Sequence, residues 1–171
     1  SPEDAARRAR YQALAEAARE AGLACVLVAQ HADDQAETLL LALSRGAGLP
    51  GLAGMPASFE RHGMTFLRPL PSVPGSELRR IAQALPFGFI EDPTNADTRF
   101  TRNRIRHELL PALERAFPSF RDTFSRSARH AGQAQRLLDE VGACEFAGLC
   151  GGEPEIAGLQ ELGTTGRGEW M

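Results

Sequence analysis

The spacing of apolar and polar residues predicts a helix, a strand and a second helix at the start of the chain. Residues 3–21 are rich in alanine with apolar positions near helical spacing, and Gly22 stands where helices commonly end. Residues 23–29 are a continuous apolar run, which is typical of a parallel strand covered on both faces. Two acids open the next helix, over residues 33–44. The polar residues between strand and helix should therefore lie at the carboxyl edge of a sheet, where open α/β sheets bind ligands.

Shorter elements are predicted in the middle of the chain. Glycine and proline fill residues 46–56, which we expect to be a loop, and a strand is expected around residues 65–70. Ser76 is the expected cap of a helix over residues 77–85. Residues 88–91 predict a further short strand.

The last part of the chain is predicted to be helical. After a polar loop, a helix is expected over residues 102–117, with Pro111 inside it as a point of kinking or splitting. Residues 119–149 are helical again by their pattern. We expect the boundary between two parts near residues 111–118. These parts are an α/β domain with a parallel sheet and flanking helices over residues 1–115, and a helical appendage over residues 116–171.

Composition narrows the class of protein. The hydrophobic share of 43% and charged share of 24% are those of an ordinary globular protein, without the run of roughly 20 apolar residues that a membrane helix needs. Three cysteines without a close pair argue against a disulfide framework and a zinc site. No lysine occurs, which excludes a P-loop lysine or a lysine Schiff base within these residues. The start at Ser1 has no signal-peptide pattern, so we expect a cut or boundary there and a cytoplasmic protein.

Charge is segregated along the chain, although the net charge is only −3. Between Arg99 and His130 the sequence holds eight arginines (99, 102, 104, 106, 115, 121, 126, 129) and three acids (108, 114, 122). After His130 acids outnumber arginines. A basic stretch inside an acidic protein indicates a polyanion at one face. The alternative is a solvated helix with arginine-rich sides.

A group of carboxylates follows the first predicted strand. If a helix begins at Asp33, then Asp34, Glu37 and Thr38 share one face at spacings of three and four, with His31 beside them. Carboxylates that converge at a sheet edge could hold Mg²⁺, which prefers oxygen ligands and bridges to substrate phosphates. The alternative for the acids of the first turn is that they only complement the helix dipole.

A second group consists of arginines and their neighbours. Arg102 and Arg106 are four residues apart and share a helix face, as do Asn103 and His107. Two guanidinium groups on one face could grip phosphates and position a nucleic acid without reading its sequence. Arg10, on the first helix, is a weak signal alone because an arginine on a helix surface is usually only solvated.

Together these motifs resemble the tRNA(Ile)-lysidine synthetases in order and spacing. The resemblance covers roughly residues 3–118, with Gln30 standing where many members have a second histidine. It implies an N-type ATP-pyrophosphatase (PP-loop) fold, whose Ser-Gly-Gly-x-Asp-Ser phosphate loop is absent from these residues and is expected before Ser1. The chain alone is therefore expected to be inactive. The matching segments are residues 29–38, 45–48, 51–55, 68–70, 92–95 and 101–106.

The resemblance also implies an activity and its partners. Members use ATP and Mg²⁺ to adenylate the first anticodon cytidine of a CAU-bearing tRNA(Ile), and free lysine then displaces AMP. By resemblance, Asp34 and Glu37 belong to the Mg²⁺-ATP and lysine-activation region, with Mg²⁺ on both carboxylates. The other implied roles are nucleotide contacts for His31 and Asp33, phosphate or intermediate contacts for Arg10 and Arg102, and tRNA contacts for Arg102, Asn103 and Arg106.

Two alternatives remain open at this point. One is another tRNA-modifying PP-loop enzyme such as a thiolase, although cytidine thiolases carry close cysteine pairs that Cys25, Cys144 and Cys150 do not form. The other is a non-catalytic RNA-binding module that uses the arginine helix without turnover.

Overall fold

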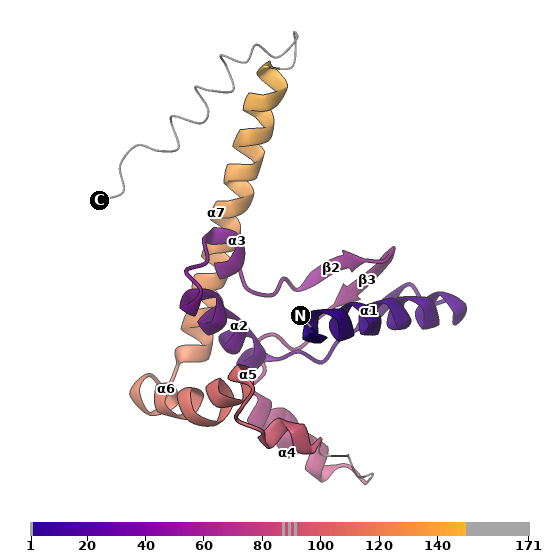
Figure 1. The fold of residues 1–171 in the computed structure, drawn as a ribbon, viewed down its shortest axis with the longest axis vertical. Coiled ribbons are helices and arrows are strands. Elements are labelled where there is room, and N and C mark those ends of the chain that lie inside the picture. Colours follow the sequence, from indigo (N-terminus) through magenta and orange to yellow (C-terminus); the bar gives the residue numbers. More distant parts are fainter. Residues whose placement is uncertain (1, 87, 89, 91, 150–171) are drawn as a thin grey trace. The chain divides into compact units, whose positions relative to one another are not determined.

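The computed structural model describes residues 2–86, 88, 90 and 92–149, and the ribbon is drawn in Figure 1. Two compact units make up the chain, Ser1–Gly132 and Gln133–Met171. The division between these units falls inside helix α7 (Phe120–Leu149) and does not test a domain boundary. The expected boundary near residue 115 therefore stays a prediction.

A three-stranded sheet lies in the first unit, in the order β1-β3-β2. Strand β1 (Cys25–Leu27) pairs in parallel with β3 (Met64–Leu67), and β2 (Ser58–Arg61) pairs with β3 antiparallel. The hairpin turns at His62 and Gly63, which both have positive φ angles of 52° and 68°, as the tight turns of twisted hairpins require. The parallel pairing and the α/β fold class are confirmed. The sheet is mixed, however, because β2 pairs antiparallel with β3. Strand β2 was not predicted from the sequence.

Helix α1 (Pro2–Glu20) covers one face of this sheet. Tyr11 and Ala15 pack with Met64 and Phe66 in a buried cluster, where the Tyr11 and Phe66 rings meet edge to face at 5.0 Å between centroids. The helix ends as predicted, since Gly22 has a φ of 67° that suits a glycine after the last turn.

The expected burial of the first strand on both faces is wrong. Val26 and Val28 pack against the α1 cluster, but Leu27 is 65% exposed, and Leu23 before the strand is also exposed. Successive side chains of a strand point to opposite faces, so only the face toward α1 is covered by the described residues.

Helix α2 (Ala32–Ser44) begins within one residue of its predicted start. The glycine-rich segment after it is more ordered than expected, because it contains the short helix α3 (Leu49–Leu52). The Gln35 side chain accepts a hydrogen bond of 2.8 Å from the Met55 amide. Position 54, next to Met55, requires glycine. The φ of Gly54 is 66°, and a Cβ there would lie 2.4 Å from the side-chain nitrogen Nε2 of Gln35.

Helix α4 (Gly75–Ala84) begins earlier than predicted, and Ser76 is not its cap. Pro74 precedes the first helical residue, and the amide of Gly75 donates to the Asp33 carboxylate at 2.8 Å. The cap therefore comes from another helix, which the local spacing could not indicate. The short strand expected at residues 88–91 falls on a stretch where Phe87, Phe89 and Glu91 lie outside the described residues.

The helix expected over residues 102–117, with a kink or split at Pro111, instead contains a π-helical turn that ends two residues before Pro111, and the helix after this turn includes the proline. A 3-10 turn (Pro93–Ala96) lies in the expected polar loop, and α5 (Thr101–Arg104) leads through a π-helical turn (Ile105–Leu109) into α6 (Leu110–Ala116). Pro111 has no amide hydrogen, and its ring would crowd the carbonyl of the preceding turn in a regular helix. The wider π turn accommodates it.

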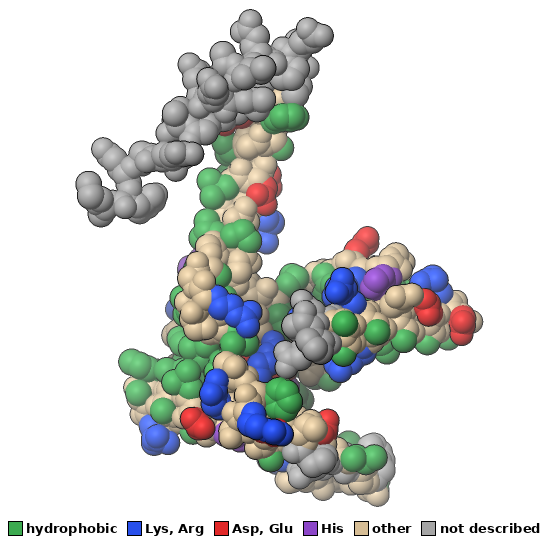
Figure 2. Space-filling model, in the orientation of Figure 1, with side chains coloured by type: hydrophobic (Ala, Val, Ile, Leu, Met, Phe, Trp, Pro, Cys, Tyr) green, Lys and Arg blue, Asp and Glu red, His purple; other side chains and the backbone are tan. Residues whose placement is uncertain are grey.

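Helix α7 (Phe120–Leu149) follows the prediction closely. Its first part belongs to the first unit, where Phe120 packs with Ala36, Ile105 and Leu110. In the second unit, hydrophobic side chains remain on the helix surface (Figure 2), including Leu137 and Phe146. Among the described residues, no helix combines the length and apolarity needed to cross a bilayer.

Candidate functional site

The acidic residues Asp34 and Glu37 lie where the sequence predicts them, after the first strand. His31 forms a parallel bridge with Leu70, so the β1 and β3 chains continue side by side past the strand ends. The His31 amide donates to the Asp34 carboxylate at 2.9 Å, which fixes the first turn of α2. This turn places Asp34 and Glu37 on one face of α2.

Arg106 joins these two carboxylates. Its Nε donates to Glu37 Oε1 at 2.7 Å, and its Nη2 donates to Asp34 Oδ1 at 3.1 Å. Glu37 is fully buried, with 0% of its side chain exposed, and Oε2 has no hydrogen-bond partner among the described residues. We call these three residues the carboxylate clamp.

Burial raises the pKa of Glu37 above its ordinary value, and the hydrogen bond and charge of Arg106 counteract only part of that rise. The nearby Asp34 carboxylate adds to the rise. Glu37 can therefore hold a proton at a pH where a surface glutamate is ionised, which is a property of groups that transfer protons.

The carboxylate clamp does not fit a Mg²⁺ ion held by both acids. Mg²⁺ demands near-octahedral oxygen ligands, whereas Arg106 already supplies the positive charge between Asp34 and Glu37. No group of three or more histidine, cysteine or acidic side chains within the described part of the chain is placed to hold a metal. Glu37 Oε2 keeps its acceptor capacity unused among the described residues.

Asp33 is engaged in a separate network that spacing alone did not reveal. Its Oδ1 accepts a hydrogen bond from Arg121 Nε, and Arg121 also donates to Glu114 at 2.8 and 2.9 Å. Arg121 is only 16% exposed, and its two carboxylate partners hold the pKa of its guanidinium above the ordinary range. Asp33 thus links α2, α4 and α7.

The predicted tRNA-binding residues have different surroundings. Arg106 faces the carboxylates, and the Asn103 amide donates to the carbonyls of Thr94 and Asp97 at 2.8 and 2.9 Å. Asn103 therefore holds the 3-10 turn in place. Arg102 keeps an exposed side chain, with Nη2 3.2 Å from Thr38 Oγ1. Of the three, Arg102 alone is exposed, and its tRNA contact stays a prediction.

Arg10 is not brought into contact with this group by the described residues. It is exposed on α1 and makes no hydrogen bond or ion pair within the described part of the chain, while its neighbour Tyr11 lies in the core. Its assignment stays a prediction.

A buried arginine that sequence reasoning did not assign lies near the end of β3. Arg68 donates to Gln30 Oε1 and, at 2.5 Å, to the carbonyl of Pro56, and its guanidinium lies 4.3 Å from the Phe59 ring centroid. It therefore positions the polar segment after β1. The Arg-Pro pair that follows the strand was the available signal.

The chain resembles known proteins over nearly all of its length. Residues 1–113 match the PP-loop domain family. A tRNA(Ile)-lysidine synthase of Polaromonas naphthalenivorans is 62% identical over 162 residues, which cover 95% of this chain and 49% of the relative. The proteins of that name from Ralstonia nicotianae and Burkholderia pseudomallei are 44% and 42% identical, with 94% of this chain covered in both cases.

The chain spans about half the length of the Polaromonas protein and about a third of the other two, of which 34% and 33% are covered. The family match covers well over half of the 171 residues and includes the whole carboxylate clamp. The chain therefore belongs to the PP-loop domain family.

Proposed function

We propose that this protein ligates lysine to the first anticodon cytidine of a CAU-bearing tRNA(Ile), with ATP as the energy source. The observation that carries the proposal is the 62% identity, over 95% of the chain, with a protein named tRNA(Ile)-lysidine synthase. The substrates are ATP, free L-lysine and the tRNA, which also implies a cytoplasmic location.

The reaction proceeds in two displacements. The ring carbonyl oxygen of the cytidine attacks the α phosphorus of ATP, and pyrophosphate leaves. The side-chain amine of lysine then attacks the ring carbon that bears this oxygen. The bond between that carbon and the oxygen breaks, AMP leaves with the oxygen, and a base takes up the protons that the amine releases. In this proposal Mg²⁺ is bound by the phosphates of ATP. It is not held between Asp34 and Glu37, because the carboxylate clamp does not fit the ion.

The carboxylate clamp suits the second displacement. Glu37 lies buried with an unpaired oxygen, and its raised pKa makes its ionised carboxylate a stronger base that can take up a proton from the lysine amine. Asp34 and Arg106 hold Glu37 in position. His31 and Asp33 form the neighbouring turn, and Arg102 contacts phosphate or the adenylated cytidine.

Arg10 is assigned by resemblance to the same phosphate contacts as Arg102. We further propose that residues 1–115 are the C-terminal part of the catalytic domain, and that residues 116–171 begin an appendage that binds tRNA. No observation favours the thiolase alternative, since Cys25 and Cys144 belong to different compact units and Cys150 lies outside the described residues.

The test is product identification with the full-length protein. Incubation with ATP, lysine and an unmodified tRNA(Ile) transcript should give AMP and, after nuclease digestion, a nucleoside heavier by the mass of lysine less water. A transcript with a different first anticodon base is the matched control. A sulfur-bearing nucleoside would support a thiolase, and tRNA binding without AMP would support a non-catalytic module.

A further inference from the structure

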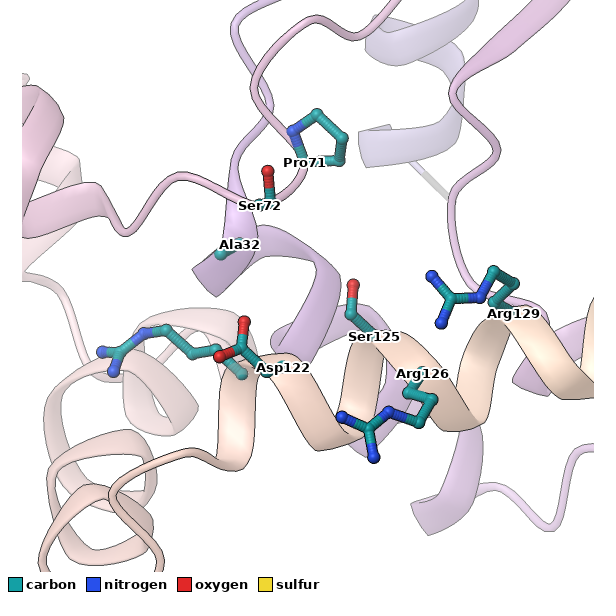
Figure 3. Close-up of a pocket in the computed structure, with 8 residues that line it drawn as sticks. Ala32, Pro71, Ser72, Asp122, Ser125, Arg126 and Arg129 are labelled. Carbon is teal, nitrogen blue, oxygen red and sulfur yellow. The ribbon is translucent and has the colours of Figure 1, made fainter.

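A pocket of about 250 Å³ opens in the first unit, between the start of α7 and the chain around the first turn of α2 (Figure 3). Figure 3 shows Ser125 and Arg129 on the side of α7 toward the loop that carries Pro71 and Ser72, and the Arg126 guanidinium on the other side of the helix ribbon in this view. Asp122 and Arg121 complete the α7 side. The α7 residues 122, 125, 126 and 129 recur at spacings of three and four, so one helix face lines the pocket.

The arginines of this pocket differ in how far they are already paired. Arg121 is bound to Asp33 and Glu114. Arg126 and Arg129 are exposed, and neither makes a hydrogen bond or ion pair with another described residue. Two guanidinium groups are therefore available to a ligand. The pocket contrasts with Arg106 and Asn103, whose donors are engaged inside the protein.

The chemistry of the lining favours a phosphodiester. Guanidinium groups and the hydroxyls of Ser72 and Ser125 are donors that match phosphate oxygens. Arg121 is already paired with Asp33 and Glu114, and the lining carries a further carboxylate, Asp122, beside Arg126 and Arg129. These nearby carboxylates disfavour a pyrophosphate with several negative charges more than the singly charged phosphodiester of a nucleic-acid backbone.

Backbone amides contribute less than side chains here. The amide of Ala32, which lines the pocket, already donates to the carbonyl of Val73 at 3.0 Å. The phosphates of a nucleotide are commonly cradled by a nest of amides, so this lining is less suited to ATP.

We propose that this pocket is a subsite for one backbone phosphate of the tRNA, with Arg126 and Arg129 as its main contacts. The inference rests on the proposed function, because that reaction supplies the RNA. The resemblance in sequence implied a tRNA contact for Arg106, whereas this proposal places a tRNA contact of the first unit at the start of α7.

Binding of an unmodified tRNA(Ile) transcript to the full-length protein, measured by fluorescence anisotropy over a range of salt concentrations, tests this subsite. Arg126→Gln and Arg129→Gln should each reduce the salt-dependence slope by roughly one, and the double variant by about two, with weaker binding at low salt. Arg129→Lys should keep the slope, because it keeps the charge. Arg19→Gln, an exposed arginine of α1 that lies outside the pocket and outside residues 116–171, is the matched control.

Titration of ATP and of inorganic pyrophosphate into the same variants separates the two sources of phosphate. Unchanged nucleotide binding with weakened tRNA binding supports the subsite. Weakened ATP binding with unchanged tRNA binding would assign the pocket to the nucleotide and overturn the proposal, as would wild-type tRNA affinity in the double variant or no tRNA binding by the wild type. If wild-type protein binds tRNA through this pocket yet forms no lysine-bearing nucleoside, the proposed function fails while the subsite stands.

Discussion

At the scale of single residues, the candidate site depends on pairs that are far apart in sequence. Arg106 reaches Glu37 across 69 positions and Asp34 across 72. A carboxylate as buried as Glu37 is strongly unfavourable unless a cation or a proton accompanies it. The spacing of Asp34 and Glu37 therefore predicted that the two acids share one helix face. Their contact with Arg106 depends on the tertiary fold and could not be predicted from spacing.

Removal of that partner should destabilise the protein. For Arg106→Gln we expect a loss of about 2–3 kcal/mol in the free energy of unfolding, below the ~3–5 kcal/mol of a fully buried pair, because Arg106 is 35% exposed. Arg104→Gln, an exposed neighbour, should change it by less than about 0.5 kcal/mol. Urea unfolding measures both. Equal small effects would mean that the carboxylate clamp does not stabilise the fold.

The raised pKa of Glu37 predicts a pH dependence of stability with a definite sign. The folded protein binds this proton more tightly than the unfolded chain, so the free energy of unfolding should fall as pH rises above about 4.5 and level off above the folded pKa. Glu37→Gln should remove that decline. The difference in urea midpoint between wild type and variant, followed from pH 4 to pH 8, is the measurement. A difference that does not vary with pH would show that the pKa is not raised.

At the scale of elements, the long helices and the two parallel strands were predictable, whereas β2, α3 and the start of α4 were not. Helices α2 and α7 begin within one residue of their predicted starts, because their capping and apolar signals are local. Strand β2 was missed since Phe59 is its one apolar residue and pairing with β3 defines it. Likewise, the N-terminus of α4 is capped by Asp33, which lies 42 positions away.

The contact between α2 and α4 predicts a specific requirement for glycine. A Cβ on Gly75 would lie 2.6 Å from Asp33 Oδ2 and 2.9 Å from His31 Cε1. Gly75→Ala should therefore cost about 1–3 kcal/mol of stability through crowding. Gly142→Ala, where a Cβ meets nothing within 4 Å, should be neutral or stabilising by up to about 1 kcal/mol. Thermal unfolding compares the two, and a stable Gly75→Ala protein would contradict this close packing.

The two sides of α5 should differ in function. Arg102 is presented beside Thr38, whereas Arg104 contacts only Thr101 at 3.3 Å among the described residues. A charge-assisted phosphate contact is worth about 1.5–3 kcal/mol, so Arg102→Ala in the full-length protein should lower kcat/KM by about tenfold to more than a hundredfold. Arg104→Ala should have little effect. Similar small losses in both variants would identify Arg102 as a solvated surface residue.

At the scale of the whole molecule, the family match and the compact units describe different divisions of the chain. The match ends at residue 113, whereas the first compact unit extends to Gly132 and includes the start of α7. Arg121, within that extension, binds Asp33 of the candidate site. Residues beyond the matched region therefore help to position the turn that carries the carboxylates.

The central claim is that the carboxylate clamp carries out the lysine transfer, and the most direct test is the rate of lysine-bearing nucleoside formation by full-length Glu37→Gln. Loss of a proton-accepting group should lower this rate by about a hundredfold or more, while tRNA affinity stays within about twofold of the wild type. Glu108→Gln, an exposed acid on the π-helical turn, should keep the wild-type rate. A folded Glu37→Gln protein with the wild-type rate would contradict the assignment of the lysine transfer to this site.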